Sequence, residues 1–260
     1  YHGGWSLGGF AGAGVLLVLL KILSLPVNQS IWGLLIVLFI AMVVVSQFML
    51  TFGSDPNAKV TKKSKSPLYF HPIALIFGLL SFVSYLVEGA VGDWSALYLF
   101  EDKGIVIEEA VMGVMLFNGT MCIGRLLGNR LGKHLTSKQV VVGGYLLGSI
   151  AMGLIVFLPG HASMYTYLLL GISLAMIVPN LFSAMGEQNV IPMTQAVATS
   201  TMLGYMGILM GPALIGFIAH GTSLTVAFIV LTILLVVSAG IGKYAYHLMS
   251  KDCGLSEEQI

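Results

Sequence analysis

The residue with the clearest capacity for chemistry in this sequence is Glu88, which follows a long apolar run in the stretch VEGAVGDWSALY. In a helix, where successive residues turn by about 100°, Glu88 shares a face with Ser81, Ser84 and Tyr85. Burial disfavours an ionised carboxyl group, so acids within a membrane are rare and usually functional. We therefore expect Glu88 to bind a proton or a substrate. The alternative is a neutral structural acid held by hydrogen bonds, or one reached by water.

Asp93, in the same stretch, is expected to have a different environment. It is turned by roughly 120° from the face of Glu88 and lies about 7 Å further along the helix axis. Trp94 and Tyr98 beside it are aromatic residues of the kind that gather where a membrane meets water. We expect Asp93 at the outer rim of the membrane, in contact with water.

A second polar face follows further along the chain, where Asn118, Cys122, Arg125 and Asn129 are separated by four, three and four residues. This spacing places the four side chains on one face of a helix. Asn118 falls about halfway across the predicted span. Its amide could hydrogen-bond a solute or, equally, a neighbouring helix.

A third polar position is Asn180, which directly follows Pro179. Proline removes a backbone donor and can bend a helix, and broken helices often mark substrate sites in transporters. The alternative is an ordinary proline kink with a locally satisfied Asn side chain. The candidate residues for a substrate or proton site are therefore Glu88, Ser84, Asn118 and Asn180.

The segments that must position these residues have the composition of membrane-spanning helices. Apolar residues make up 57% of the chain, charged residues only 9%, and the mean hydropathy is +0.94. Runs of roughly 20 apolar residues, the length of a helix that crosses a bilayer, recur along the chain. We predict an all-α polytopic membrane protein with eight transmembrane helices at residues 3–22, 31–50, 73–92, 110–127, 140–158, 165–185, 197–219 and 224–241.

Basic residues predict the orientation, because cytoplasmic loops carry an excess of Lys and Arg. If the spans alternate, all of the 12 Lys and Arg residues except Lys21 and Lys103 fall on one side. We predict that this side, with the linker and the C-terminus, is cytoplasmic, and that the protein lies in the plasma (inner) membrane. The polar, basic linker at residues 53–69 separates two helices, at residues 1–52, from six, at residues 70–247, and a polar tail follows at residues 248–260.

Sequence signatures of other functions are absent. The chain contains no HExxH, CxxC or P-loop motif. Its one GxSxG match, GWSLG at residues 4–8, lies within a predicted membrane span and not at the strand-to-helix turn of a nucleophile elbow. We therefore predict no enzymatic activity, no cofactor and no metal site. The net charge is +1 and no basic stripe is present, which gives no reason to expect a nucleic-acid partner.

The stretch GRLLGNRLGKH, at residues 124–134, lies in a predicted cytoplasmic turn between two spans. It resembles the motif of the major facilitator superfamily, which runs Gly, three residues, Asp, Arg, any residue, Gly and then basic residues. With the alignment anchored on Gly128, Asn129 replaces the Asp, whereas Arg130 and Gly132 match. The resemblance implies a secondary transporter that works by alternating access.

In that family the motif occurs between helices two and three and, more loosely, between helices eight and nine. The second register fits this chain, so that its spans would correspond to helices five to twelve of a twelve-helix fold. Residues 207–216 resemble the glycine-proline pattern of family helix eleven. Residues 2–9 and 87–98 are together similar to the MosC-like branch, close to fucose-permease-like sugar symporters. The resemblance therefore implies a fragment whose first four helices, a partner of this chain, are missing.

The motif's Arg pairs, in the family, with an acid at the cytoplasmic end of the neighbouring helix, which here would be Glu187. By resemblance its expected partner is Arg130, with Arg125 as second choice, and the pair would act as a latch that biases one open state. The alternative is an exposed ion pair that contributes only about 0–1 kcal/mol. The predicted cytoplasmic gating residues are Gly124, Arg125, Gly128, Asn129, Arg130, Gly132 and Glu187.

Together, the residues and the resemblance predict a proton-coupled symporter of a sugar-like or small amphipathic solute. Its partners would be the solute, protons and the lipid bilayer. The alternative function is a membrane receptor or assembly subunit that binds a ligand in the helix bundle without transporting it.

Overall fold

The computed structural model describes residues 2–48, 71–131, 135–188 and 191–253, and each of its elements is a helix. Within these ranges seven helices are long and apolar enough to cross a membrane, and Leu7–Ile22 is a shorter apolar helix. The predicted class, an all-α polytopic membrane protein, is confirmed. The expected linker at residues 53–69 lies outside the described residues.

All eight predicted spans overlap with helices. The sixth is divided into α6, α7 and α8, and α10 continues to Cys253, into the segment expected as a tail. The bounds are α1 His2–Leu17, the π-helix η1 Val18–Ile22, α2 Val27–Ser46, α3 Pro72–Glu101, α4 Ile107–Leu131, α5 Ser137–Phe157, α6 Gly160–Tyr165, α7 Tyr167–Leu174, α8 Ile177–Glu187, α9 Met193–Gly221 and α10 Leu224–Cys253.

Local capping determines where two of the long helices begin. Before α3, His71 Nδ1 accepts a hydrogen bond from Ile73 N at 3.3 Å, and Pro72 occupies the first turn, where its missing N–H is not needed. Before α5, Thr136 Oγ1 accepts from Gln139 N at 3.2 Å, and Gln139 Oε1 accepts from Thr136 N at 3.1 Å. This reciprocal pair is a capping box, which satisfies two backbone donors at the helix start.

The break between α7 and α8 has a cause in the sequence. It falls at Ala175 and Met176, and Pro179 has no N–H to donate to the Ala175 carbonyl. Asn180 Nδ2 donates to Met176 O at 2.8 Å, so the side chain satisfies a carbonyl at the break. The bend that the sequence predicts around Pro179 is therefore present, one helical turn before the proline.

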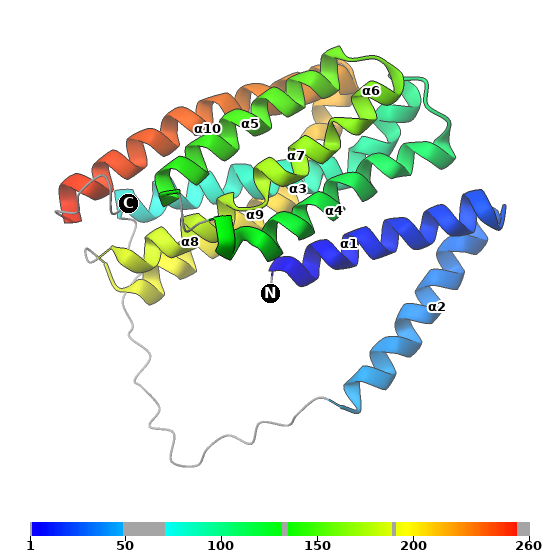
Figure 1. The fold of residues 1–260 in the computed structure, drawn as a ribbon, viewed down its shortest axis with the longest axis horizontal. Helices are drawn as coiled ribbons and strands as arrows, with labels where there is room; N and C mark the ends of the chain where they lie inside the picture. Colours follow the sequence, from blue (N-terminus) through cyan, green and yellow to red (C-terminus); the bar gives the residue numbers. More distant parts are fainter. Residues whose placement is uncertain (1, 49–70, 132–134, 189–190, 254–260) are drawn as a thin grey trace.

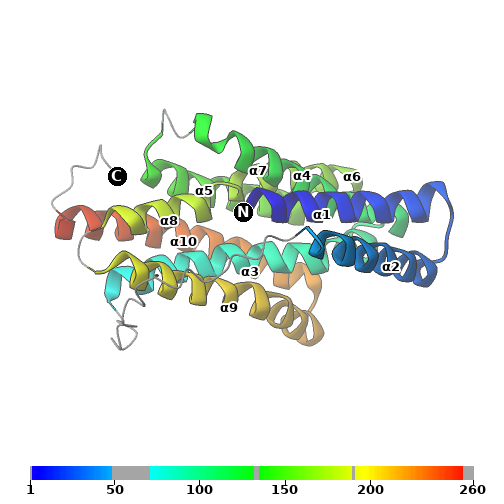
Figure 2. The ribbon, with the colours of Figure 1, turned by 90° about the horizontal axis from the view of Figure 1, so that it is seen from below.

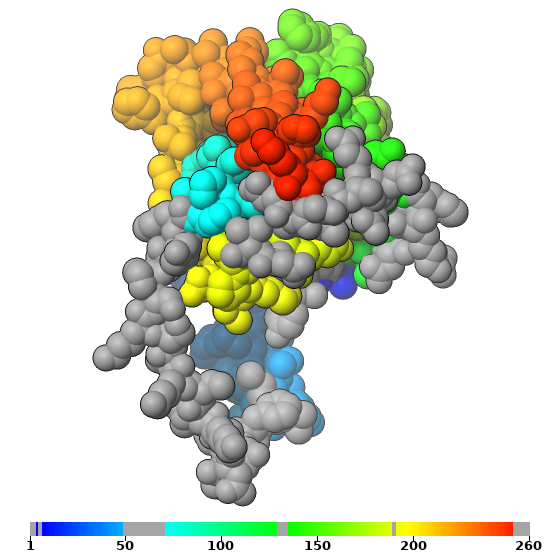
Figure 3. Space-filling view, turned by 90° about the vertical axis from the view of Figure 1, so that its left-hand side faces the viewer, coloured from blue at the N-terminus to red at the C-terminus, as the bar shows by residue number. Residues whose placement is uncertain are grey.

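Helices α3 to α10 lie side by side and form the main bundle (Figure 1). Helix α1 runs along α4, whereas α2 leaves the end of α1 and diverges from the bundle; Figure 2 shows the same arrangement from below. Only 6% of the α2 span is buried within the described structure. Figure 3 looks onto the predicted cytoplasmic end, where the end of α10 (red) lies beside the start of α3 (cyan).

The most extensive helix contact joins α3 to α9 and depends on glycine. A Cβ atom at Gly207 would overlap the Phe82 carbonyl oxygen, and one at Gly211 would lie 2.5 Å from the Leu86 carbonyl oxygen. Small residues four positions apart allow such close approach of two helix backbones. The contact brings the second half of α9 beside Glu88.

The turn between α3 and α4 is anchored by Lys103. Its Nζ donates to Val156 O, at the end of α5, at 2.6 Å and lies 5.3 Å from the centroid of the Tyr98 ring. Partial burial lowers the pKa of Lys103, and the neighbouring Asp102 carboxylate opposes that shift. The turn thus fixes α3 and α4 against the end of α5.

Candidate functional site

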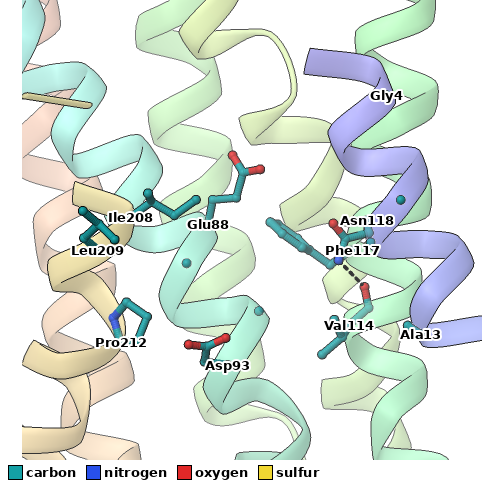
Figure 4. A pocket seen from close by; sticks show the side chains of 14 residues that line it. Gly4, Ala13, Glu88, Asp93, Val114, Phe117, Asn118, Ile208, Leu209 and Pro212 are labelled. Carbon is teal, nitrogen blue, oxygen red and sulfur yellow. Dashed lines mark hydrogen bonds between the residues drawn. The ribbon is translucent and has the colours of Figure 1, made fainter. Parts of the chain in front are cut away.

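A cavity of about 780 Å³ lies between α1, α3, α4 and α9. Figure 4 shows α3 between two walls, with α9 on one side and α4 and α1 on the other. The volume falls within the range of small-molecule sites, about 300–1,000 Å³. The polar lining residues are Glu88, Asp93 and Asn118; the others are Gly4, Gly8, Gly9, Ala13, Gly89, Gly92, Val114, Phe117, Ile208, Leu209 and Pro212.

Glu88 forms an ion pair with Arg125 at the wall of this cavity. Arg125 Nη2 donates to Glu88 Oε2 at 3.0 Å, and Arg125 Nη1 donates to Oε1 at 3.5 Å. The two contacts run in parallel, as the planar guanidinium and carboxylate groups allow. The Arg125 and Glu88 side chains are only 3% and 7% exposed. Burial of the predicted acid is therefore accompanied by a buried partner of opposite charge.

The pairing differs from the sequence expectation, which placed Arg125 near a cytoplasmic turn as second choice for Glu187. Helices α3 and α4 run antiparallel, and Arg125 lies about five residues further from their shared turn than Glu88, which is about 7 Å. Helical side chains lean toward the N-terminus of their own helix. Glu88 therefore leans away from the turn and Arg125 toward it, so the two long side chains close the gap. The sequence did contain one indication that Arg125 belongs near the site, because Arg125 shares a helix face with Asn118.

Asn118 lines the cavity and is 9% exposed. Its Nδ2 donates to Val114 O of the same helix at 3.0 Å, drawn as a dashed line in Figure 4. A Cβ atom at Gly9 would lie 2.6 Å from Asn118 Oδ1, so α1 can pass this amide only because residue 9 is glycine. Among the described residues, the Asn118 amide group donates no hydrogen bond to another helix.

The placement of Asp93 corrects the sequence analysis. Asp93 is exposed, as expected, but it lines the same cavity as Glu88 instead of facing away from it. Gly89 and Gly92 have no side chains, so the cavity extends past them from one acid to the other. Trp94 Nε1 donates to the Pro212 carbonyl oxygen at 2.9 Å, so this ring holds α3 against α9.

Two other predicted lining residues lie elsewhere. Ser84 is buried beside the Tyr145 hydroxyl group of α5. Asn180 Oδ1 accepts a hydrogen bond from Ser137 Oγ, at the start of α5, at 3.2 Å. Neither residue lines the cavity, and the local partners of Asn180 fit the reading of an ordinary proline kink. The described residues contain no group of three or more His, Cys, Asp or Glu side chains that could hold a metal ion.

Two glycines of the motif-like stretch are packing positions. A Cβ atom at Gly124 would lie 2.5 Å from Ala175 Cβ, and one at Gly128 would overlap Met176 Sδ. These glycines let α4 cross the chain at the break between α7 and α8. The side chains of Asn129 and Arg130, and all of Gly132, lie outside the described residues.

The predicted latch partner Glu187 is exposed at the end of α8, near Tyr246 of α10. Arg125 is engaged with Glu88. A latch between Glu187 and Arg130 stays a prediction.

Comparison with known proteins shows what kind of molecule carries this site. No protein-family model matches the chain. An uncharacterised MFS-type transporter of Yersinia pestis is 36% identical over 244 residues, which cover 92% of this chain and 61% of that protein. The chain is a homologue of MFS-type transporters. The seven long apolar helices of the described residues, together with this similarity, show that the chain is an integral membrane protein.

Two further relatives match shorter parts. Membrane protein MosC of Rhizobium meliloti is 31% identical over 58% of this chain and 37% of its own length. An uncharacterised transporter of Sinorhizobium fredii is 28% identical over 60% of the chain and 41% of its own length. The chain thus spans about three fifths of the Yersinia relative and less of the other two.

Proposed function

We propose that the full-length protein moves a small solute across the membrane by alternating access, and that protons are coupled to transport through the Glu88–Arg125 pair. The observation that carries the proposal is a buried, two-pronged ion pair at the wall of a solute-sized cavity. Homology to MFS-type transporters supports the transport part of the proposal.

A buried ion pair is poorly suited to stability alone. Removing two charges from water costs about as much free energy as their attraction returns, and apolar replacements are often as stable. Ionisable residues inside a membrane usually belong to the path of a substrate or an ion. The Glu88–Arg125 pair is therefore better explained as a functional pair, which alternates between an ionised, paired form and a protonated, separated form, than as a contact that only stabilises the fold.

Protonation would switch the pair between those states. A proton on Glu88 removes the carboxylate charge and releases the Arg125 guanidinium group from it. Neutral Glu88 can then donate a hydrogen bond to a solute in the cavity. Because Glu88 is on α3 and Arg125 is on α4, the change alters the contact between these helices. Protons are coupled to transport if protonation of Glu88 changes the free-energy difference between the inward-open and the outward-open state.

The cavity wall is mostly apolar with few polar groups, which suits a small amphipathic or sugar-like solute. The exposed apolar surface of α2 suits further helices of the same polypeptide, consistent with the greater length of the Yersinia relative. The excess of Lys and Arg on one side supports a cytoplasmic linker and C-terminus in a plasma (inner) membrane protein.

The proposal is tested with the full-length protein in liposomes. Sugars, polyols and amines are screened for accumulation driven by an imposed pH gradient. Glu88→Gln should still exchange labelled for unlabelled solute and should lose gradient-driven accumulation. The control is Glu101→Gln, which removes an exposed carboxyl group from the same helix and should accumulate solute as the wild type does.

Normal accumulation by Glu88→Gln would place coupling at another residue. Binding of a solute without exchange or accumulation in the wild type would instead favour the receptor or assembly-subunit function.

A further inference from the structure

We infer that the cavity takes a solute with a protonated amine, and that Asp93 is the residue that recognises this group. The inference names the substrate class of the proposed transporter and so rests on that function, but its test does not require transport.

The charge balance of the cavity favours a cation. Glu88 and Arg125 compensate each other within their ion pair. Asp93 lines the cavity, is exposed, and has no ion-pair or hydrogen-bond partner among the described residues. None of the described lining residues is Lys, Arg or His. Among the described lining residues, one negative charge therefore remains uncompensated.

The uncharged polar groups of the wall are acceptors. Asn118 Nδ2 is used by Val114 O, which leaves the amide oxygen of a side chain only 9% exposed; in Figure 4 this oxygen points away from Val114. Pro212 has no N–H, so the Ile208 carbonyl lacks its usual helical donor. That carbonyl oxygen faces α3, 3.0 Å from where a Cβ atom of Gly89 would lie.

The Trp94 ring N–H and the terminal guanidinium nitrogens of Arg125 already have acceptors within the protein. The Trp94 ring N–H is bound to the Pro212 carbonyl oxygen, and Arg125 is bound to Glu88. A solute must therefore bring its own N–H or O–H donors to satisfy the acceptors of the wall. An anion would meet like charge at Asp93, and a neutral polyol could donate a hydrogen bond to that carboxylate but would leave its charge uncompensated. An ammonium group supplies both the N–H donors for the acceptors of the wall and a positive charge for Asp93. The apolar remainder of the wall suits the rest of an amphipathic amine.

The test measures the electrostatic preference of the cavity in the full-length protein. Native cysteines are replaced by serine, and one reporter cysteine is introduced at Ala13 on α1, the wall opposite α3 (Figure 4). The reporter is modified with cationic trimethylammonioethyl or anionic sulfonatoethyl methanethiosulfonate. The ratio of the two rates is divided by the same ratio for free mercaptoethanol. In water, a unit charge between about 8 and about 14 Å from the thiol changes each rate roughly twofold in opposite directions, so we expect a normalised ratio of about three to six.

Asp93→Asn should lower the normalised ratio to about one, because it removes the charge and keeps the shape of the side chain. Asp93→Glu should keep the ratio high and shows that the Asp93→Asn effect is not a general disturbance. The control Glu101→Gln removes an exposed carboxyl group of α3 that does not line the cavity, and should leave the ratio unchanged.

A ratio of one or less in the unsubstituted reporter protein would overturn the inference, as would a high ratio that Asp93→Asn does not change. Either result could coexist with gradient-driven uptake, which would leave the proposed function intact. Conversely, a high, Asp93-dependent ratio in a protein that transports nothing would support a cation site and contradict transport.

Discussion

At the scale of single residues, the environment of Glu88 decides what this acid can do. Its carboxylate is held by two parallel contacts from Arg125, and both side chains are almost completely buried. Each residue offsets the free-energy cost of burying the other, because an unpaired charge in this position would be desolvated without compensation. Loss of one partner is therefore more harmful than loss of both.

This coupling can be measured with a double-mutant cycle. Glu88→Gln leaves Arg125 buried without its counter-charge, and Arg125→Gln does the reverse, so each should cost about 3–5 kcal/mol of stability. The double variant, which carries both Glu88→Gln and Arg125→Gln, should lose clearly less stability than the sum of the losses of the two single variants. The measurement is thermal unfolding in detergent for all four proteins. Additive losses would show that the two residues are not coupled in this way.

An exposed ion pair between η1 and α4 provides a contrast to the buried Glu88–Arg125 pair. Lys21 Nζ donates to Glu109 Oε1 at 2.6 Å, and His161 Nε2 lies 3.0 Å from Glu109 Oε2. The Lys21 and Glu109 side chains are 47% and 29% exposed, so water and salt screen their attraction. Lys21→Met should change stability by less than about 1 kcal/mol, and by less still in high salt. A loss as large as that of Glu88→Gln, in the same unfolding assay, would contradict this reading.

Residue type alone selected Glu88 and Asn118 as candidates, because polar groups are rare in apolar spans, and both line the cavity. Their partners could not be predicted. The Glu88–Arg125 pair depends on the depth of two antiparallel helices and on the lean of their side chains, which requires knowing that α3 and α4 pack together. That the exposed Asp93 also lines the cavity could not be predicted, because helical phase alone does not reveal a cavity that extends past two glycines.

At the scale of elements, the cavity depends on how closely α3 and α9 approach. Their backbones touch where Gly207 and Gly211 face carbonyl groups of α3, and Trp94 ties the same helices together further along. Backbone carbonyl groups cannot move aside as a flexible side chain would. A side chain at these glycines must therefore push the helices apart.

Gly207→Ala should destabilise the protein by about 1–3 kcal/mol, because the added methyl group meets the Phe82 carbonyl group. The matched control is Gly143→Ala in α5, where a Cβ atom would have no heavy atom within 4 Å. That change should be neutral or slightly stabilising, since alanine favours a helix more than glycine does. Thermal unfolding of both variants checks the difference. Equal stability of the two variants would mean that α9 does not pack on α3 through this contact.

Element positions were largely predictable because a bilayer requires apolar runs of a given length, and every predicted span overlaps with a helix. The ends were less predictable. Helix α10 continues beyond its apolar stretch into a polar segment, which composition alone does not indicate. The sequence predicted that the helix bends near Pro179, and the break between α7 and α8 lies there. It did not predict that Asn180 forms hydrogen bonds with Met176 and Ser137 instead of lining the cavity.

At the scale of the whole molecule, the cavity crosses the boundary that the sequence predicts at the linker. Helix α1 belongs to the first part, whereas α3, α4 and α9 belong to the second. The Glu88–Arg125 pair lies entirely within the second part, and Asn118 of the same part approaches Gly9 of α1. In the proposed cycle, a change in the pair alters the wall against which α1 rests. Movement of α1 relative to α4 would then open or close the cavity.

The central claim is that Glu88 exchanges a proton in the working protein, and infrared difference spectroscopy tests it most directly. Spectra of the full-length protein in lipid are recorded before and after the addition, at constant pH, of a solute that the uptake assay identifies. We predict a carbonyl-stretch band of a protonated carboxyl group that disappears in Glu88→Gln and persists in Glu101→Gln. A solute-induced spectrum in which no carboxyl band depends on Glu88 would contradict the account.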